Sequence, residues 1–85
     1  MEPEFSKHAL EQMERRCISK ELVLSFISHP DSIVNQDEKV RIYSKLVIEG
    51  SKSYFYRVFI NHLKDPAFVI TAYKTSKTEK YGYKI

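Results

Sequence analysis

The predicted fold depends on one stretch of the sequence, Val40-Arg-Ile-Tyr-Ser-Lys-Leu-Val-Ile-Glu-Gly-Ser-Lys-Ser-Tyr-Phe-Tyr-Arg-Val-Phe-Ile60. On both sides of Glu49-Gly-Ser-Lys52, a more apolar set of residues alternates with a less apolar one, for example Val40, Ile42 and Leu46 with Arg41, Tyr43 and Lys45. A period of two is typical of strands with one buried face. Glycine with polar neighbours favours a turn. The stretch therefore predicts a β-hairpin with strands over residues 40–48 and 54–60.

Two further strands flank this hairpin in the sequence. Residues 32–36 form a short candidate strand before it, and Asp37-Glu38 a turn. Residues 67–73 alternate again after a turn over 62–66 that contains Pro66. Because the connections between strands are short, neighbouring strands are expected to run antiparallel.

Two helices are predicted before the first strand. Ser6 and Ser19 are suited to be N-caps, and Pro30 ends the second helix. The apolar stripe of the first helix is expected to be Leu10, Met13 and Cys17, and that of the second Leu22, Val23, Phe26 and Ile27. The predicted fold class is α+β, with two N-terminal helices packed on one face of a four-stranded antiparallel sheet.

Composition limits the classes of protein that fit. The 85 residues are expected to form one domain, 1–85, and the two glycines exclude a glycine-rich phosphate loop. The single cysteine excludes an internal disulfide and favours a reducing cytoplasm. No apolar run is long enough to span a bilayer, so no membrane partner is expected.

The positive charge lies at the end of the sequence. Residues 1–70 contain ten basic and ten acidic residues, whereas residues 71–85 contain four lysines and one glutamate. Residues 74–85 are therefore expected to form a basic C-terminal tail. A local excess of lysine beside hydroxyl groups and tyrosines points to a phosphate-bearing partner.

One face of the sheet is a candidate RNA-binding surface. If the more apolar set of each long strand faces the helices, the other face carries Arg41, Tyr43, Lys45, Phe55, Arg57, Phe59, Thr71 and Tyr73. Cations interleaved with aromatic rings suit single-stranded RNA, because cations bind phosphates and rings stack on unpaired bases. Lys77 and Lys80 of the tail would add phosphate contacts. The same residues also suit an ordinary solvent-facing sheet surface.

The available side chains suit one reaction, RNA cleavage by attack of the ribose 2′-hydroxyl on the adjacent phosphate. Arg57 and Lys74 could stabilise the crowded phosphorane. His8, Tyr73 or Tyr81 could act as acid or base, although His8 also fits an ordinary surface position. The three histidines have no metal-ligand spacing, so neither a metal nor a cofactor is predicted.

Short motifs near both ends carry a family resemblance. His8-Ala9, Met13, Arg15-Arg-Cys-Ile-Ser19 and His29-Pro-Asp31 stand near the start, and Arg57-Val58, residues 70–77 and Lys80-Tyr81 near the end. Together they resemble a family of small, largely uncharacterised bacterial domains, which is similar in turn to the RelE/BrnT-like ribonuclease toxins.

The resemblance to these toxins implies metal-independent cleavage of mRNA, on or off the ribosome, and a cognate antitoxin protein. Arg57, Lys74, Lys77 and Tyr81 occupy places similar to the catalytic positions of such toxins. Lysine stands at Lys74 and Lys77 where BrnT-like toxins tend to carry arginine, and lysine is a less directional phosphate ligand.

Two other functions use the same residues. A non-catalytic RNA-binding module would use the same surface without an acid or base. A protein-interaction domain would use exposed aromatic side chains, namely Phe55, Phe59, Tyr81 and Tyr83.

Overall fold

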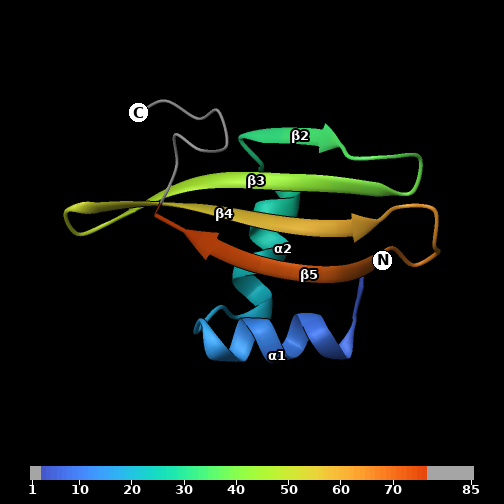
Figure 1. Ribbon diagram of the computed structural model, residues 1–85, viewed down its shortest axis with the longest axis horizontal. Coiled ribbons are helices and arrows are strands. Elements are labelled where there is room, and N and C mark those ends of the chain that lie inside the picture. Colours follow the sequence, from blue (N-terminus) through green and yellow to red (C-terminus); the bar gives the residue numbers. More distant parts are fainter. Residues whose placement is uncertain (1–2, 77–85) are drawn as a thin grey trace.

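The computed structural model describes residues 3–76. Its elements, in chain order, are β1 (Glu4–Phe5), α1 (Lys7–Arg15), α2 (Lys20–Ser28), β2 (Ser32–Asn35), β3 (Val40–Glu49), β4 (Lys52–Asn61) and β5 (Phe68–Thr75). Figure 1 shows the long strands side by side, with α2 crossing the sheet and α1 running along β5. The α+β class and the two N-terminal helices are as predicted.

The described sheet has five strands and is mixed, so the prediction of four antiparallel strands is wrong. The strand order is β1-β5-β4-β3-β2, and β1 runs parallel to β5. The amide of Glu4 donates to the carbonyl of Ala67 at 2.8 Å, and that of Ser6 to Val69 at 2.9 Å. A strand of two residues has no periodicity of its own, so only its pairing with β5 defines it.

Both predicted helix caps are confirmed. The Ser6 hydroxyl accepts a hydrogen bond from the amide of Ala9 at 2.9 Å, and the Ser19 hydroxyl from that of Leu22 at 3.1 Å. These bonds satisfy amides of the first helical turns, which have no partner within the helix. The Ser6 hydroxyl also donates to the carbonyl of Ile70 at 2.7 Å, which ties the start of α1 to β5.

The buried stripe of α1 differs from the predicted one. Ala9 and Met13 are buried, whereas Leu10 is 39% exposed and Cys17 is exposed. Cys17 lies just beyond α1 with a φ of 55°, in the left-handed region. The chain reverses there toward α2, so the side chain of Cys17 leaves the apolar stripe and is not the core residue that was expected.

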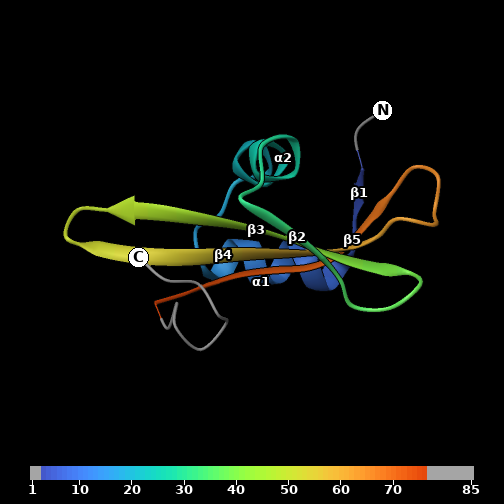
Figure 2. The same ribbon diagram turned by 90° about the horizontal axis from the view of Figure 1, so that it is seen from above.

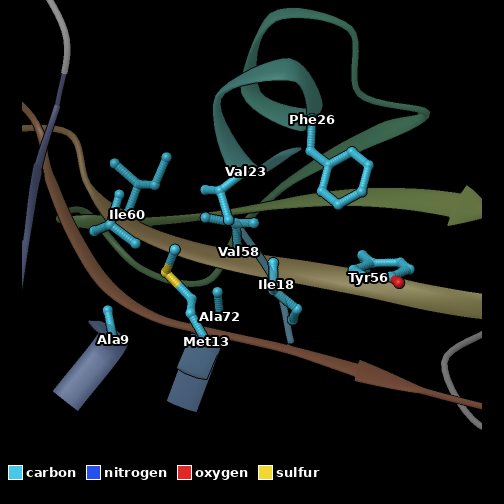
Figure 3. Packing of buried hydrophobic residues seen from close by; sticks show 10 residues of the cluster. Ala9, Met13, Ile18, Val23, Phe26, Tyr56, Val58, Ile60 and Ala72 are labelled. Carbon is cyan, nitrogen blue, oxygen red and sulfur yellow. The ribbon is translucent and has the colours of Figure 1, made fainter. Parts of the chain in front are cut away.

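The core lies between the helices and one face of the sheet (Figure 3). It consists of Ala9, Met13, Ile18, Val23, Phe26, Tyr56, Val58, Ile60, Val69 and Ala72. Both helices contribute to this one cluster, and Figure 2 shows α2 on one side of the sheet. We call this side the helix face and the opposite side the outer face.

The turn between β3 and β4 decides which residues lie on each face. Glu49 pairs with Lys52, and Gly50 between them has a φ of 64°, a conformation that glycine adopts without strain. The core residues of β4 are Tyr56, Val58 and Ile60, so this register places their β3 partners on the helix face, namely Lys45, Tyr43 and Arg41. The prediction that Arg41, Tyr43 and Lys45 lie on the outer face is therefore wrong.

A bulge in β5 produces a second difference. The register between β4 and β5 shifts between Phe59 and Ile60, because Ile60 pairs with Val69 while Phe59 pairs with Thr71. Ala72 reaches the core as predicted, and Val69 reaches it in place of the predicted Phe68 and Ile70. One extra residue on a bulged strand inverts the alternation on one side of the bulge.

Candidate nucleic-acid interface

Three side chains form a compact group on the outer face, which we call the Arg57 cluster. Arg57 and Tyr73 are direct cross-strand partners of β4 and β5, and Phe59 follows Arg57 on the same face. Arg57 Nη1 donates to the Tyr73 hydroxyl at 2.9 Å. The guanidinium carbon lies 5.4 Å from the centre of the Phe59 ring and 6.0 Å from that of Tyr73. The two rings are stacked, with centroids 6.0 Å apart and an interplanar angle of 28°.

The surroundings of the Arg57 cluster are uncharged, and they are apolar except for Ser44, the partner of Arg57 on β3, and Thr71 and Thr75 of β5. Phe59 pairs with Ile42 of β3, and the neighbouring outer-face position of β4 is Phe55. Ile42 and Phe55 are buried, whereas Arg57, Phe59 and Tyr73 are half-buried. Among the residues of β2–β5 on this face, Arg57 is the only charged one. A cation in such surroundings interacts more strongly with an anion than it would in water.

This geometry suits recognition of a phosphate beside an unpaired base. The contacts with Tyr73 and Phe59 hold the guanidinium in place, so little side-chain entropy is lost when it binds an anion. Arginine binds phosphate through parallel N–H donors, and aromatic rings on a sheet are stacking platforms for bases. The Tyr73 hydroxyl adds a group that can carry a proton.

The structure brings together part of the predicted RNA-binding set. Thr71 and Tyr73 lie on the outer face with Arg57, as expected. On the helix face, Arg41 Nε donates to Asn35 Oδ1 at 3.2 Å, and Lys45 Nζ lies 3.4 Å from Asp31 Oδ1. Tyr43, Arg41 and Lys45 are thus separated from the Arg57 cluster by the thickness of the sheet.

Lys74 also lies on the helix face, because it pairs with Tyr56 while its neighbour Tyr73 pairs with Arg57. Lys74 Nζ lies 3.5 Å from Glu49 Oε1 and 4.7 Å from the centre of the Tyr54 ring. The main-chain carbonyl of Lys74 accepts a hydrogen bond from Arg16 Nη1 at 3.3 Å. The two cations expected to act on one phosphate, Arg57 and Lys74, therefore face opposite sides of the sheet.

Tyr56 completes this network at the end of the hairpin. Its hydroxyl donates to Glu49 Oε2 at 2.6 Å, and this bond, aided by the charge of Lys74, lowers the pKa of the Glu49 carboxyl. Burial and the bond to Glu49 raise the pKa of Tyr56 well above its ordinary value. The network of Glu49, Tyr56 and Lys74 joins β3, β4 and β5.

The remaining predicted site residues lie elsewhere. His8 is exposed on α1, whose buried residues pack on the helix face, so it does not approach the Arg57 cluster. Tyr81, Lys77, Lys80 and Tyr83 lie outside the described residues, whereas Lys74, the first residue of the expected tail, belongs to β5.

The contact between Lys64 and the Phe68 ring is among the cation–ring pairs that were not predicted from the sequence. Lys64 Nζ lies 4.6 Å from the centre of the Phe68 ring. Phe68 pairs with Asn61, so it belongs to the outer face beyond the bulge. The sequence contains no signal for the bulge. The hairpin, in contrast, could be predicted from Gly50. A two-residue turn at this glycine fixes which residues of β3 and β4 share a face.

Residues 3–76 contain neither a candidate metal site nor a candidate membrane-spanning helix. No group of three or more His, Cys, Asp and Glu side chains could hold a metal ion there. No helix in the same part of the chain combines the length and apolar character needed to cross a membrane.

Comparison with known protein families gives a match over most of the chain. The profile of a family described as a domain of unknown function (DUF4258) matches residues 5–74, from β1 to the end region of β5. The chain belongs to the DUF4258 family. The matched span of this DUF4258 domain includes all three residues of the Arg57 cluster. No curated protein and no solved structure matches the chain.

Membership of the DUF4258 family agrees with the expected resemblance to an uncharacterised domain family. The match offers no evidence of a relationship with the RelE/BrnT-like toxins, and the family description names no activity. The function of this DUF4258 domain is therefore argued from the geometry of its outer face.

Proposed function

We propose that this DUF4258 domain binds single-stranded RNA on its outer face. Arg57 binds a backbone phosphate, and Phe59 and Tyr73 stack on an adjacent base. The observation that carries the proposal is the Arg57 cluster, in which a half-buried cation is held by a 2.9 Å hydrogen bond and by two rings. Lys64 and Phe68 supply a second combination of cation and ring on the outer-face side of β5.

A second candidate function is cleavage of the bound RNA, and the Arg57–Tyr73 contact favours it. The 2′-hydroxyl oxygen forms a bond to the adjacent phosphorus, the bond to the 5′-oxygen breaks, and the products are a 2′,3′-cyclic phosphate and a 5′-hydroxyl. The 2′-hydroxyl proton passes to a base, and the leaving oxygen takes up a proton. Arg57 stabilises the charge on the phosphorane, and the Tyr73 hydroxyl acts as acid or base.

Cleavage of this kind would make the domain a metal-independent ribonuclease of the toxin–antitoxin type, with mRNA as substrate, on or off the ribosome, and an antitoxin as protein partner. Lys74 and His8 take no part in this version, because they do not lie on the outer face. The separation of Lys74 from Arg57 is why binding ranks above cleavage. A protein-interaction domain remains the alternative for the same apolar face.

Binding is tested with a short unstructured RNA by fluorescence anisotropy at several salt concentrations. Arg57→Gln removes the outer-face cation, and Arg41→Gln is the matched control because it removes an arginine from the helix face of the neighbouring strand. Loss of one charge-assisted hydrogen bond of about 1.5–3 kcal/mol lowers affinity about ten- to hundred-fold. The slope of log affinity against log salt becomes shallower by about 0.7 for one lost phosphate contact.

The Arg41→Gln variant is expected to keep the wild-type affinity. Equal effects of the two substitutions, or no RNA binding by the wild-type protein, would show that the outer face is not the binding surface. The protein-interaction function would be supported if the wild-type protein binds no RNA but co-purifies with a protein that is absent from the purified Arg57→Gln variant.

Cleavage is tested on the same RNA by mapping new 5′ ends, with Tyr73→Phe as the decisive variant. Discrete ends that carry a 5′-hydroxyl and disappear with Arg57→Gln and Tyr73→Phe are expected of a ribonuclease. Growth arrest on induced expression of the wild type, but not of Arg57→Gln, would indicate a toxin. RNA that is bound tightly and stays intact would leave the binding function alone standing.

A further inference from the structure

Three residues near the centre of the outer face are buried, although no described helix covers that face. Ile42 is 6% exposed, Ser44 is 3% exposed and Phe55 is 3% exposed. We call these three residues the buried patch; they surround the Ser44–Arg57 pair of β3 and β4. Both described helices bury their apolar residues on the helix face, and the described turns lie at the ends of the strands (Figure 1). Within residues 3–76, nothing that lies above the sheet therefore accounts for this burial.

The sheet itself does not account for the burial of Phe55. Phe59, on the same strand and face, has a partner on each side, Ile42 of β3 and Thr71 of β5, yet it stays half-buried. Phe55 pairs with Thr75, the last residue of β5, so it lies closer to the rim of the sheet. A ring nearer the rim should be the more exposed one, because an uncovered sheet face is in contact with water. The opposite order requires a cover above Phe55.

The cover belongs to the same chain, because the burial is a property of a single copy. Residues 1–2 and 77–85 are the parts of the chain outside the described residues. Residues 1–2 precede β1, which pairs with β5 at Phe68, seven residues before Thr75. At about 3.3 Å per residue, Phe68 and Thr75 are about 23 Å apart, which two residues cannot bridge. Residues 77–85, in contrast, follow the end of β5 that lies beside the buried patch.

Residues 77–85 have the pattern of a segment with one apolar side. Apolar residues alternate there with basic or small ones, in the order Lys80, Tyr81, Gly82, Tyr83, Lys84, Ile85. Alternate residues of an extended segment point to opposite sides, so the apolar residues share one side and the two lysines share the other. Nine extended residues span about 30 Å, whereas β5 and β3 are two strand spacings, about 10 Å, apart. The segment is therefore long enough to cross the buried patch.

We propose that residues 77–85 dock on the outer face of their own chain, with Tyr81, Tyr83 and Ile85 packed on the buried patch. The patch offers a ring and an aliphatic side chain as packing partners, and aromatic side chains bury large apolar areas in such contacts. All three residues of the Arg57 cluster keep part of their surface exposed, so the cluster stays accessible to a ligand beside the docked segment.

The docking has a consequence for RNA, and this consequence rests on the RNA-binding function proposed above. With its apolar side on the sheet, the docked segment turns Lys80 and Lys84 outward, on the same face as Arg57. A phosphate backbone that binds Arg57 then meets two further cations. The docked segment thus supplies the outer-face cations that Arg41 and Lys45 do not, since these two residues lie on the helix face.

Thiol reactivity of the full chain tests the docking in a Cys17→Ser background. Ser44→Cys places a thiol of similar size in the buried patch, and Ile48→Cys is the matched control on the same face of β3, where Ile48 is 67% exposed. A covered thiol reacts only when the cover opens, so Ser44→Cys should react with a small disulfide reagent at least about ten-fold more slowly than Ile48→Cys. Tyr81→Ser combined with Tyr83→Ser should remove the cover. The Ser44→Cys rate should then rise about ten-fold, whereas the Ile48→Cys rate stays the same.

A second thiol separates undocking from unfolding. Val58→Cys lies in the core on the helix face, where Val58 is 1% exposed, so it should react slowly with and without the tyrosine substitutions. Tyr83→Ser alone makes the same comparison with less disturbance of the fold. A Ser44→Cys thiol that reacts as fast as that of Ile48→Cys in the otherwise unchanged chain would overturn the proposal. So would a Ser44→Cys thiol that stays slow after both tyrosines are replaced.

The consequence for RNA is tested with Lys80→Gln and Lys84→Gln combined. This variant should keep the slow Ser44→Cys reaction, because it leaves the apolar side of the segment intact. Its RNA affinity should fall, and the slope of log affinity against log salt should become shallower by about 1.4 for two lost phosphate contacts. Unchanged affinity would overturn the role of the two lysines. A wild type that binds no RNA would refute the proposed function, whereas the thiol rates would still decide the docking.

Discussion

Replacing Ile60 by alanine removes γ and δ carbons from the centre of the core, where Ile60 is 3% exposed and lies opposite Val69. At about 0.8 kcal/mol per carbon group, the lost transfer free energy is about 2.4 kcal/mol. A residual cavity of about 50 Å³ adds about 1.2 kcal/mol at about 24 cal/mol per Å³. The free energy of unfolding should therefore fall by about 3.5 kcal/mol, a large part of the total for a domain of this size.

The matched control is Ile48→Ala, on the partner strand of the same hairpin. Ile48 is 67% exposed, so its side chain contributes only about a third of the full transfer free energy, about 0.8 kcal/mol. Its replacement by alanine leaves no cavity. Urea unfolding followed by far-UV circular dichroism measures both losses. The melting temperature of Ile60→Ala should fall by about 15–25 °C. Equal losses for the two variants would refute the assignment of Ile60 to the core and of Ile48 to an exposed position.

Two further predictions concern local contacts. Tyr56→Phe removes the hydrogen-bond donor that lowers the pKa of the Glu49 carboxyl. A carboxyl whose pKa is lowered by folding contributes its full stabilisation only at pH values above its ordinary pKa, which is 4.5 for this group. The difference in unfolding free energy between wild type and Tyr56→Phe should thus be present at neutral pH and shrink as pH falls below 4.5; a difference independent of pH would contradict this. Cys17→Gly should raise stability by about 0.5–1 kcal/mol, because glycine adopts the φ of 55° without strain. Thermal melts should show no such gain for Cys17→Ala.

The sequence predicted the elements that local interactions define. The hydroxyls of Ser6 and Ser19 bond amides three residues onward, so both caps could be read without knowledge of the fold. The apolar face of α2 was predicted because Val23 and Phe26 follow the helical period and Ser19 fixes where the helix begins. The strands of the β3–β4 hairpin were predicted for the same reason, since their alternation is a local property.

The candidate site was predicted in part. Arg57, Phe59 and Tyr73 were assigned to one face, and the structure holds them in contact. The error lay in ranking the two faces of β3 by apolar content. The outer face of β3 is its more apolar one, and the helices cover the other face, so that ranking gave the wrong answer.

By itself, the sequence determined the helices, their caps, the long strands and the two aromatic residues, Phe59 and Tyr73, that share a face with Arg57. The tertiary structure alone decided that Arg41, Tyr43 and Lys45 face the helices, that Lys74 is separated from Arg57, and that β1 joins the sheet. The physical reason is that a side chain's face depends on register, and register is set by pairing between strands. A tight turn at Gly50 fixes which residues of β3 and β4 meet. The extra residue in β5 inverts the alternation on one side of the bulge, so that Val69 and Ala72 share a face.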